Sequence, residues 1–299
     1  MRAKLDELVT AALQCGAAVP AFTCYDFATA TAVVEAAEET GLPVILNVAP
    51  KTAASRAGQR LIAALRGLAD GAVVPVCVQL DHASDLAVIR ESVRSGADCV
   101  LADGSSLGFE ENIALVREVR AALDADGGGV VDADGGLYDH GAAAVVLEAE
   151  LGGLAGDEDK AFGVDAGEAA GLTDPAQVRD FVERSGAQLL AVAIGNVHGK
   201  YKGAPQIRWD VLGRISAETD VPLVLHGASG IPADELLKAR TLGVGKVNFN
   251  TELRTGILAT LEAETAAHRA DGENLQGLLG RWNVSAKEFA AATLRTLGE

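Results

Sequence analysis

Eight short apolar segments alternate along the chain with segments of helical periodicity, and this alternation restricts the fold more than any other feature. The strand-like segments are rich in β-branched residues and are bounded by Gly, Pro or Asp: 19–24, 43–49, 74–80, 99–105, 145–153, 189–199, 222–230 and 246–251. The helix-like segments cover 28–40, 53–70, 85–96, 109–123, 175–185, 208–218, 232–242 and 251–270. Strands this apolar are typical of parallel sheets that helices cover. The sequence predicts an α/β fold, a single (β/α)8 TIM barrel over residues 1–299, with an open doubly wound sheet as the alternative.

Composition limits the environment and the partners of the chain. With 299 residues and 49% hydrophobic composition it can bury a large core, and it contains no run of about eighteen apolar residues. Its first residues, MRAKLDELVTAALQ, lack the apolar region and cleavage site of a signal peptide, so we expect a cytoplasmic protein. A net charge of −17 repels nucleic acids and anionic membranes, so we expect neither as a partner. Four scattered cysteines without a CxxC motif argue against disulfides and thiolate metal sites.

Three segments depart from the alternation. Residues 154–174 form a long, acidic, Gly-rich connection after the fifth strand, and we interpret them as a lid loop. Residues 124–141, DADGGGVVDADGGLYDHG, precede that strand on the opposite face; they predict a solvated hairpin or mobile insertion, with a calcium loop as the alternative, although the EF-hand spacing is absent. Residues 271–299 predict a C-terminal helical extension that covers the barrel or pairs subunits.

Three of the five histidines stand at the ends of predicted strands. They are His82 after the third strand, His198 near the end of the sixth and His226 at the end of the seventh. Because the carboxyl ends of barrel strands meet on one face, these imidazoles can approach one point. One histidine at a strand end is more often structural, but three in equivalent positions predict a catalytic Zn2+ site with an open fourth position.

Four acids accompany the histidines. Asp81 adjoins His82 and could exchange protons with a substrate, or could simply bond backbone amides at the end of its strand. Consecutive strand residues point to opposite faces, so Asp81 and His82 can share the site only where the regular pleat ends. Glu148 and Glu150 alternate to one face, and at least one is expected to face the metal; an exposed salt bridge is the alternative. Asp103 is placed to accept the second N–H of a ligand histidine.

The seventh and eighth strands end in small and polar residues. The motifs HGASGIP and VNFNTEL place Gly227, Ser229, Asn248 and Thr251 where TIM barrels commonly bind phosphate. Small residues let the backbone approach an anion, although ordinary turns use the same residues. The motifs therefore favour a phosphate site.

Together these motifs resemble the class II, zinc-dependent ketose-bisphosphate aldolases, the family of fructose- and tagatose-bisphosphate aldolases. The resemblance is carried by QLDHASD, GADCVLADGSSLGFEENI, LEAELGGLAGDEDK, LTDP, LAVAIGNVHGKYKG, VPLVLHGASGIP and GVGKVNFNTELR, which cover most of residues 75–255. It implies zinc ligands at His82, His198 and His226, proton transfer by Asp81, and Glu150 as a metal-proximal acid. It implies that the phosphate of a dihydroxyacetone phosphate moiety is held by Gly199, Gly227, Ala228, Ser229, Asn248, Phe249, Asn250 and Thr251.

The resemblance also implies a function and partners. We expect reversible cleavage of fructose 1,6-bisphosphate or tagatose 1,6-bisphosphate to dihydroxyacetone phosphate and an aldehyde, with a monovalent cation, Na+ or K+, near the phosphate, in a homodimer or homotetramer. Thr23, Asn47 and Ala49 depart from the residues usual in the family at the first two strand ends. Two alternatives therefore stay open: an aldolase with a different aldehyde partner, and a non-catalytic sugar-phosphate-binding relative.

Overall fold

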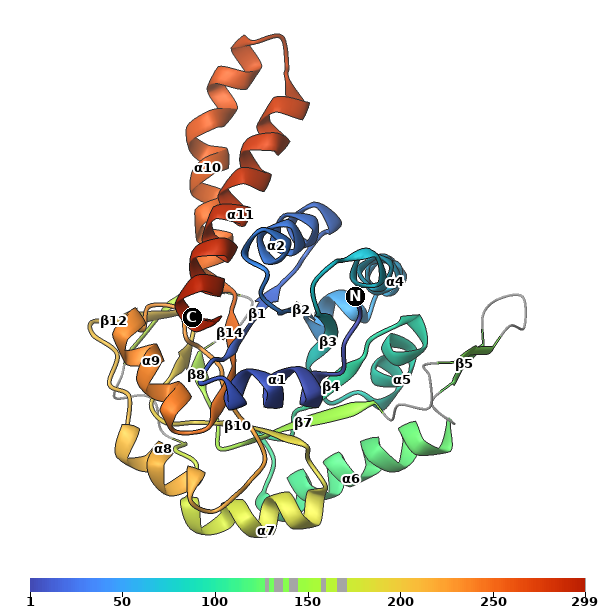
Figure 1. The fold of residues 1–299 in the computed structure, drawn as a ribbon, viewed down its shortest axis with the longest axis vertical. Coiled ribbons are helices and arrows are strands. Elements are labelled where there is room, and N and C mark those ends of the chain that lie inside the picture. Colours follow the sequence, from blue (N-terminus) through green and yellow to red (C-terminus); the bar gives the residue numbers. More distant parts are fainter. Residues whose placement is uncertain (127–128, 132–136, 140–144, 157–159, 166–170, 299) are drawn as a thin grey trace.

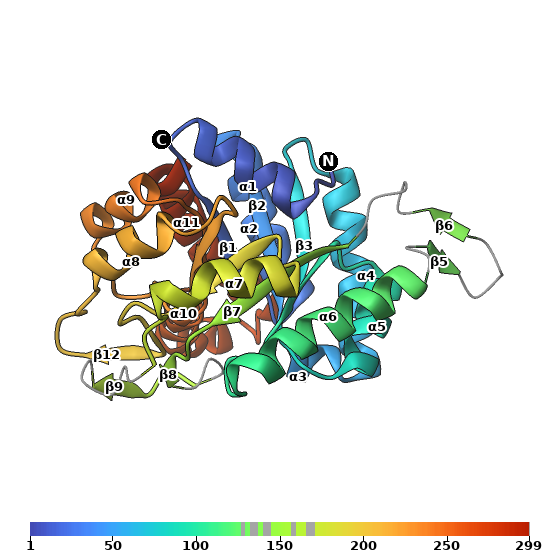
Figure 2. The same cartoon turned by 90° about the horizontal axis from the view of Figure 1, so that it is seen from below.

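The computed structural model is a closed barrel of eight parallel strands, as the sequence predicted (Figures 1 and 2). Around the barrel the order is β1, β2, β3, β4, β7, β10, β13 and β14, and β14 closes onto β1. The strands span Val19–Thr23, Val44–Val48, Val76–Ala83, Cys99–Ala102, Val146–Leu151, Leu189–Val192, Leu223–Leu225 and Val244–Phe249. The structure describes residues 1–126, 129–131, 137–139, 145–156, 160–165 and 171–298.

Helices surround the strands. They are α1 (Leu5–Gln14), α2 (Phe27–Thr40), α3 (Pro50–Ala53), α4 (Arg56–Gly71), α5 (Leu86–Ser95), α6 (Phe109–Ala125), α7 (Pro175–Ser185), α8 (Trp209–Ser216), α9 (Ala233–Thr241), α10 (Thr251–Ala270) and α11 (Leu275–Gly298). The expected helix over 53–70 corresponds to α4, which begins at Arg56, and Ala53 is instead the last residue of α3. Ser55 precedes α4, and its hydroxyl accepts a hydrogen bond from the Gly58 N–H at 3.0 Å, which is the geometry of an N-cap.

The barrel interior is apolar near the amino ends of the strands and polar near their carboxyl ends. Near the amino ends of the strands, inward residues such as Val19, Ile45 and Cys77 form a small cluster that α1 covers. Towards the carboxyl ends the buried residues become polar, as at Asn47 and Gln79. The outward strand residues pack with the surrounding helices in the main core. The fold thus places buried polar side chains at one mouth of the barrel.

The segments that interrupt the alternation have partly described structures. Within 124–141, β5 (Gly129–Val131) and β6 (Leu137–Asp139) pair antiparallel, and the other insertion residues beyond 126 lie outside the described residues. The expected lid contributes β8 (Ala155–Gly156) and β9 (Gly163–Asp165). These pair with β11 (Val197–His198) and β12 (Lys200–Lys202), while 157–159 and 166–170 lie outside the described residues.

The C-terminal helices form a long hairpin that projects from the barrel (Figure 1). Helix α11 runs back from its tip and packs against α10 and α2. Among the helices of the described residues, none is both long and apolar enough to cross a membrane.

Candidate active site

An irregularity at the end of β3 brings Asp81 and His82 to the same side. His82 has a φ of 44°, in the left-handed region that non-glycine residues rarely adopt, and the pairing of β3 with β4 shifts register between Leu80 and Ala83. This conformation costs about 1–2 kcal/mol and ends the regular pleat. Consecutive residues of a regular strand point to opposite faces, but at this irregularity the His82 imidazole no longer points to the face opposite Asp81.

The three predicted histidines converge at the polar mouth. The ring centroid of His82 lies 5.0 Å from that of His198 and 4.6 Å from that of His226, and the other pair of centroids is 6.2 Å apart. One ring nitrogen from each histidine lies within 4.8 Å of the others. Burial, together with the charges of His82 and His226, holds the pKa of His198 well below its ordinary value, so this imidazole is neutral at pH 7 and can act as a ligand.

Carboxylates bind one ring nitrogen of His82 and one of His226. We call these the outer nitrogens, and the two that face each other the inner nitrogens. His82 Nδ1 lies 2.8 Å from Asp103 Oδ2 and 3.4 Å from Glu150 Oε2, and His226 Nε2 lies 2.9 Å from Glu148 Oε1. Burial opposes ionisation of Asp103, but the hydrogen bond and charge of His82 outweigh it and lower the Asp103 pKa. Each outer nitrogen therefore carries the hydrogen.

The inner nitrogens of His82 and His226 face each other. His82 Nε2 and His226 Nδ1 are 2.8 Å apart, and in the neutral tautomers that the carboxylates select both present lone pairs. His198 Nε2 is buried and has no hydrogen-bond partner among the described residues. A shared proton or a metal cation relieves this repulsion, and three neutral imidazoles with carboxylates behind them form the donor set that Zn2+ prefers. The residues present therefore fit a zinc ion.

A buried ion pair between Lys246 and Glu148 holds the carboxylate that binds His226. Lys246 Nζ lies 2.7 Å from Glu148 Oε2, which also accepts a hydrogen bond from Gln79 Nε2 at 2.8 Å, and both charged side chains are fully buried. Burial alone would raise the pKa of Glu148, but the charge of Lys246 and the hydrogen bond from His226 lower it to about 2. Lys246 was not predicted from the sequence. The signal was a lysine inside a fully buried strand segment whose other residues, except Asn248, are apolar or glycine, VGKVNF.

Asp81 is buried beside the imidazoles and is held by two amides. Its Oδ2 accepts hydrogen bonds from Asn47 Nδ2 at 2.9 Å and from Asn248 Nδ2 at 3.1 Å. Its Oδ1 is buried and has no hydrogen-bond partner in the described part of the chain. The carboxylate is thus oriented on one side and has a lone pair available on the other.

The predicted phosphate residues border a small hollow next to two of the histidines. It is lined by His198, Gly199, His226, Gly227, Ser229, Asn248, Asn250 and Thr251. Gly227 has a φ of 59°, and a Cβ there would lie 2.2 Å from the Val197 carbonyl oxygen, so only glycine fits. The side chains of Ala228 and Phe249 are buried, and that of Phe249 packs against Phe22 and Phe289, so these two residues can contact a ligand there only through the backbone.

Comparison with known families fits this geometry. The family model of the class II fructose-bisphosphate aldolases matches residues 3–136 and 138–299. The chain belongs to this family. It is an enzyme, a class II aldolase.

Individual members of the family are similar over most of their length. The D-tagatose-1,6-bisphosphate aldolase subunit GatY of Klebsiella oxytoca is 42% identical over 239 residues, which are 80% of this chain and 78% of that protein. The crystal structure of the YdjI aldolase from Escherichia coli K12 superposes with a TM-score of 0.82 at 28% identity, over 100% of this chain and 98% of that one. The fructose-bisphosphate aldolase of Campylobacter jejuni, with a TM-score of 0.76 and 20% identity over 99% and 95% of the two chains, shares the fold.

Proposed function

We propose that this class II aldolase binds Zn2+ through His82, His198 and His226 and cleaves a ketose 1,6-bisphosphate to dihydroxyacetone phosphate and an aldehyde. The observation that carries the proposal is the pair of inner imidazole nitrogens, 2.8 Å apart with both outer nitrogens bonded to carboxylates. Such a pair needs a proton or a metal cation between its nitrogens, and the buried Asp81 carboxylate adjoins it through Asn248, whose amide contacts both Asp81 and His226. A purely binding protein would need neither a metal nor a proton carrier.

Each residue then has a defined task. Bound Zn2+ would supply Lewis-acid polarisation of the substrate's carbonyl oxygen. Asp81 Oδ1 takes the proton of the hydroxyl on the carbon that becomes the aldehyde, the carbon–carbon bond breaks, and the electron pair of that bond remains on the three-carbon phosphate fragment. A proton from solvent, taken up at that carbon after the aldehyde has left, completes dihydroxyacetone phosphate. In condensation Asp81 returns the hydroxyl proton. Asp103 and Glu148 hold two imidazoles in position, and Glu150 remains a metal-proximal acid close to His82.

The phosphate of the three-carbon fragment belongs in the hollow beside His198 and His226. Gly199, Gly227, Ser229 and the run from Asn248 to Thr251 border it, and the backbone at Gly227 can approach an anion without a side chain in the way. A monovalent cation, Na+ or K+, near this phosphate is part of the proposal and follows from the family resemblance alone. Residues 154–174 would act as a lid that excludes water from the reacting carbon.

We also propose that the single barrel domain works as a homodimer or homotetramer through its C-terminal extension. The hairpin of α10 and α11 leaves Leu258 and Leu275 each 63% exposed, and Leu279 and Val284 are also exposed. Exposed apolar side chains on a projecting element are typical of subunit contacts. Sedimentation equilibrium of the wild type and of a Leu258→Lys, Leu275→Lys variant tests this: assembly should weaken in the variant, and a monomeric wild type would refute it.

The decisive experiment for the proposed reaction is a coupled assay of dihydroxyacetone phosphate release. Fructose and tagatose 1,6-bisphosphates are compared with Zn2+ present and after chelation, using Asp81→Ala as the control. We expect release that a chelator abolishes and that Asp81→Ala lowers by about 10²–10⁴-fold. Release from neither substrate by protein containing zinc would contradict the proposed substrates.

A further inference from the structure

A short loop after β13 borders the proposed phosphate hollow. It comprises residues 227–230, which we call the phosphate loop, and its residues Gly227 and Ser229 line the hollow. The first residue of the loop is held from outside, because the Tyr201 hydroxyl donates a hydrogen bond to the Gly227 carbonyl oxygen at 3.0 Å. The backbone geometry of the phosphate loop therefore depends on a side chain that does not belong to it.

The Tyr201 hydroxyl is a hydrogen-bond donor at neutral pH. Burial raises the pKa of Tyr201 to about 12, so the hydroxyl keeps its hydrogen. The same oxygen accepts a longer hydrogen bond, at 3.4 Å, from the Val197 N–H. Replacing Tyr201 by Phe would keep the ring and leave the Gly227 carbonyl without this donor.

A carbonyl held in place also fixes the amide that follows it. A trans peptide unit is planar, so the C=O of Gly227 and the N–H of Ala228 point in opposite directions. While the oxygen is bonded to Tyr201, the Ala228 N–H points away from the tyrosine. Glycine restricts the rotation of its neighbouring peptide units less than any other residue, so a contact from outside is needed to select one orientation.

Tyr201 is itself held by its neighbours. It lies in β12, where its backbone pairs with that of the buried Val164 in β9. Its ring lies against the far end of the phosphate loop, since a Cβ at Gly230 would be 3.3 Å from the ring atom Cδ2. The Gly230 N–H in turn donates to Glu252 Oε1 at 2.9 Å. Strand pairing and ring packing together keep the Tyr201 hydroxyl at the Gly227 carbonyl.

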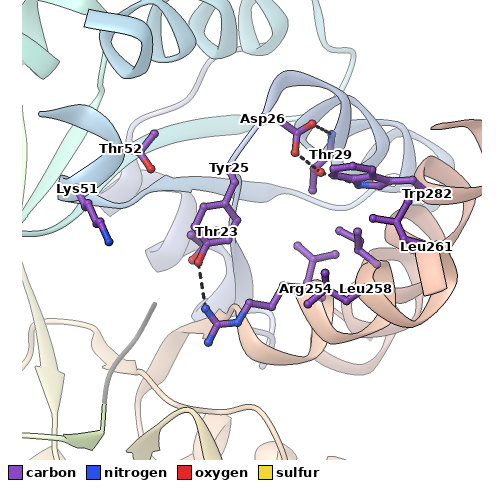
Figure 3. A pocket seen from close by; sticks show the side chains of 12 residues that line it. Thr23, Tyr25, Asp26, Thr29, Lys51, Thr52, Arg254, Leu258, Leu261 and Trp282 are labelled. Atoms are coloured by element: carbon purple, nitrogen blue, oxygen red, sulfur yellow. Dashed lines mark hydrogen bonds between the residues drawn. The ribbon is translucent and has the colours of Figure 1, made fainter. Parts of the chain in front are cut away.

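A second tyrosine at this mouth of the barrel makes a different kind of contact. The Tyr25 hydroxyl is hydrogen bonded to Asn250, with Oη···Nδ2 at 2.9 Å, and accepts a hydrogen bond from Arg254 Nη1 at 3.4 Å. It borders a separate cavity of about 510 Å³, and Figure 3 shows it turned towards Arg254. These partners are side chains, whereas the partner of Tyr201 is the backbone of the phosphate loop.

We propose that Tyr201 is a positioning residue for the substrate phosphate: its hydroxyl holds the Gly227 carbonyl, and thereby the Ala228 N–H, in the orientation that binds the anion. The proposal rests on the proposed function, because it requires a phosphate in the hollow. Tyr201 acts through the backbone of the phosphate loop and not by touching the reacting atoms. Its effect therefore falls on ligands that carry a phosphate, and not on ligands that the metal site alone would bind.

Binding of two ligands that differ only by the phosphate tests the proposal. Zinc-loaded protein is titrated with dihydroxyacetone phosphate and with dihydroxyacetone, without aldehyde, and proton NMR gives each Kd. Tyr201→Phe should raise the Kd of dihydroxyacetone phosphate about fivefold to tenfold, the usual effect of one lost hydrogen bond. The Kd of dihydroxyacetone should stay within about twofold of the wild-type value, because this ligand does not reach the phosphate loop. An unchanged ratio of the two Kd values overturns the proposal.

A control variant and a kinetic measurement separate positioning from general damage. Tyr138→Phe makes the same chemical change in β6, outside the barrel, and should keep the wild-type ratio of Kd values. In cleavage of a ketose bisphosphate, Tyr201→Phe should raise KM and leave kcat within about twofold, because the phosphate is bound equally in the ground and transition states. A parallel rise of both Kd values, or a lower kcat at unchanged KM, overturns the proposal.

The wild type distinguishes failure of this proposal from failure of the proposed function. It should bind dihydroxyacetone phosphate at least about tenfold more tightly than dihydroxyacetone, since hydrogen bonds to a charged group are strong. If the wild type shows this preference and Tyr201→Phe keeps it, only the role of Tyr201 is wrong. If the wild type shows no preference, the hollow does not hold a phosphate and the proposed function itself is wrong.

Discussion

Replacing Lys246 by Met should reverse the sign of the pH dependence that Glu148 contributes to the free energy of unfolding. In the metal-free wild type, the pKa of Glu148 falls from its ordinary 4.5 to about 2 because Lys246 and His226 offset the cost of burial. A folded-state pKa below the unfolded value contributes stability that is present above pH 4.5 and is lost as the pH falls towards 2. A shift of this size corresponds to about 3 kcal/mol.

In Lys246→Met the carboxylate keeps its burial and loses its main cation. Its folded-state pKa should then rise above 4.5, so stability falls as pH rises, and at pH 7 the variant should lose about 3–5 kcal/mol. The double variant Lys246→Met, Glu148→Gln removes both charges and should recover most of that loss. Because Glu148 also orients His226, zinc affinity should fall about 10–100-fold in both variants.

Urea unfolding of metal-free protein between pH 4 and 8, followed by tryptophan fluorescence, measures the stability terms, and competition with a chromogenic chelator measures zinc affinity. If the single variant keeps the wild-type pH dependence, or the double variant is no more stable than the single one, the argument that Glu148 depends on Lys246 is refuted. Unchanged zinc affinity in both variants would show that Glu148 does not position His226.

Three further predictions concern other parts of the molecule. Burial raises the pKa of Asp98 to about 6 from 3.8, so between pH 4 and 6 the folded state binds more protons than the unfolded state. The free energy of unfolding should therefore fall by about 3 kcal/mol as pH rises through this range. Urea titrations should show a flatter pH dependence in Asp98→Asn, and an unchanged dependence would argue against this role of Asp98. Asp103→Asn should weaken zinc binding about 10–100-fold in chelator competition, and wild-type affinity would mean that the contact with His82 does not orient the ring. Phe22→Ala should cost about 3–5 kcal/mol in urea unfolding, against less than about 0.5 kcal/mol for the exposed Leu258→Ala, and similar losses in the two would contradict the packing described here.

The barrel was predictable because its signals are local. Apolar strand runs and helical periodicity repeat with little interruption, and Asp174 followed by Pro175 correctly predicted the start of α7. Most boundaries agree within a few residues. The predicted helix over 53–70 was placed to begin too early, at Ala53 and not at Arg56, because its helical periodicity conceals the N-cap at Ser55.

The candidate site was predictable only in part. His82, His198 and His226 could be grouped because a parallel barrel brings strand ends together, whatever their separation in sequence. Lys246 was missed because its role depends on Glu148, 98 residues away, and on burial of both.

The closure of β14 onto β1 has a consequence for the order in which the chain folds. Val19 pairs with Lys246, and the Ala18 N–H donates to the carbonyl oxygen of Leu297 at 2.9 Å, so the first strand acquires partners from the end of the chain. Contacts of such sequence separation form slowly, and synthesis proceeds from the N-terminus. On the ribosome, one edge of β1 stays unpaired until nearly the whole polypeptide has emerged. The nascent barrel therefore exposes an apolar strand edge throughout translation, when a chaperone that shields β1 would protect it most.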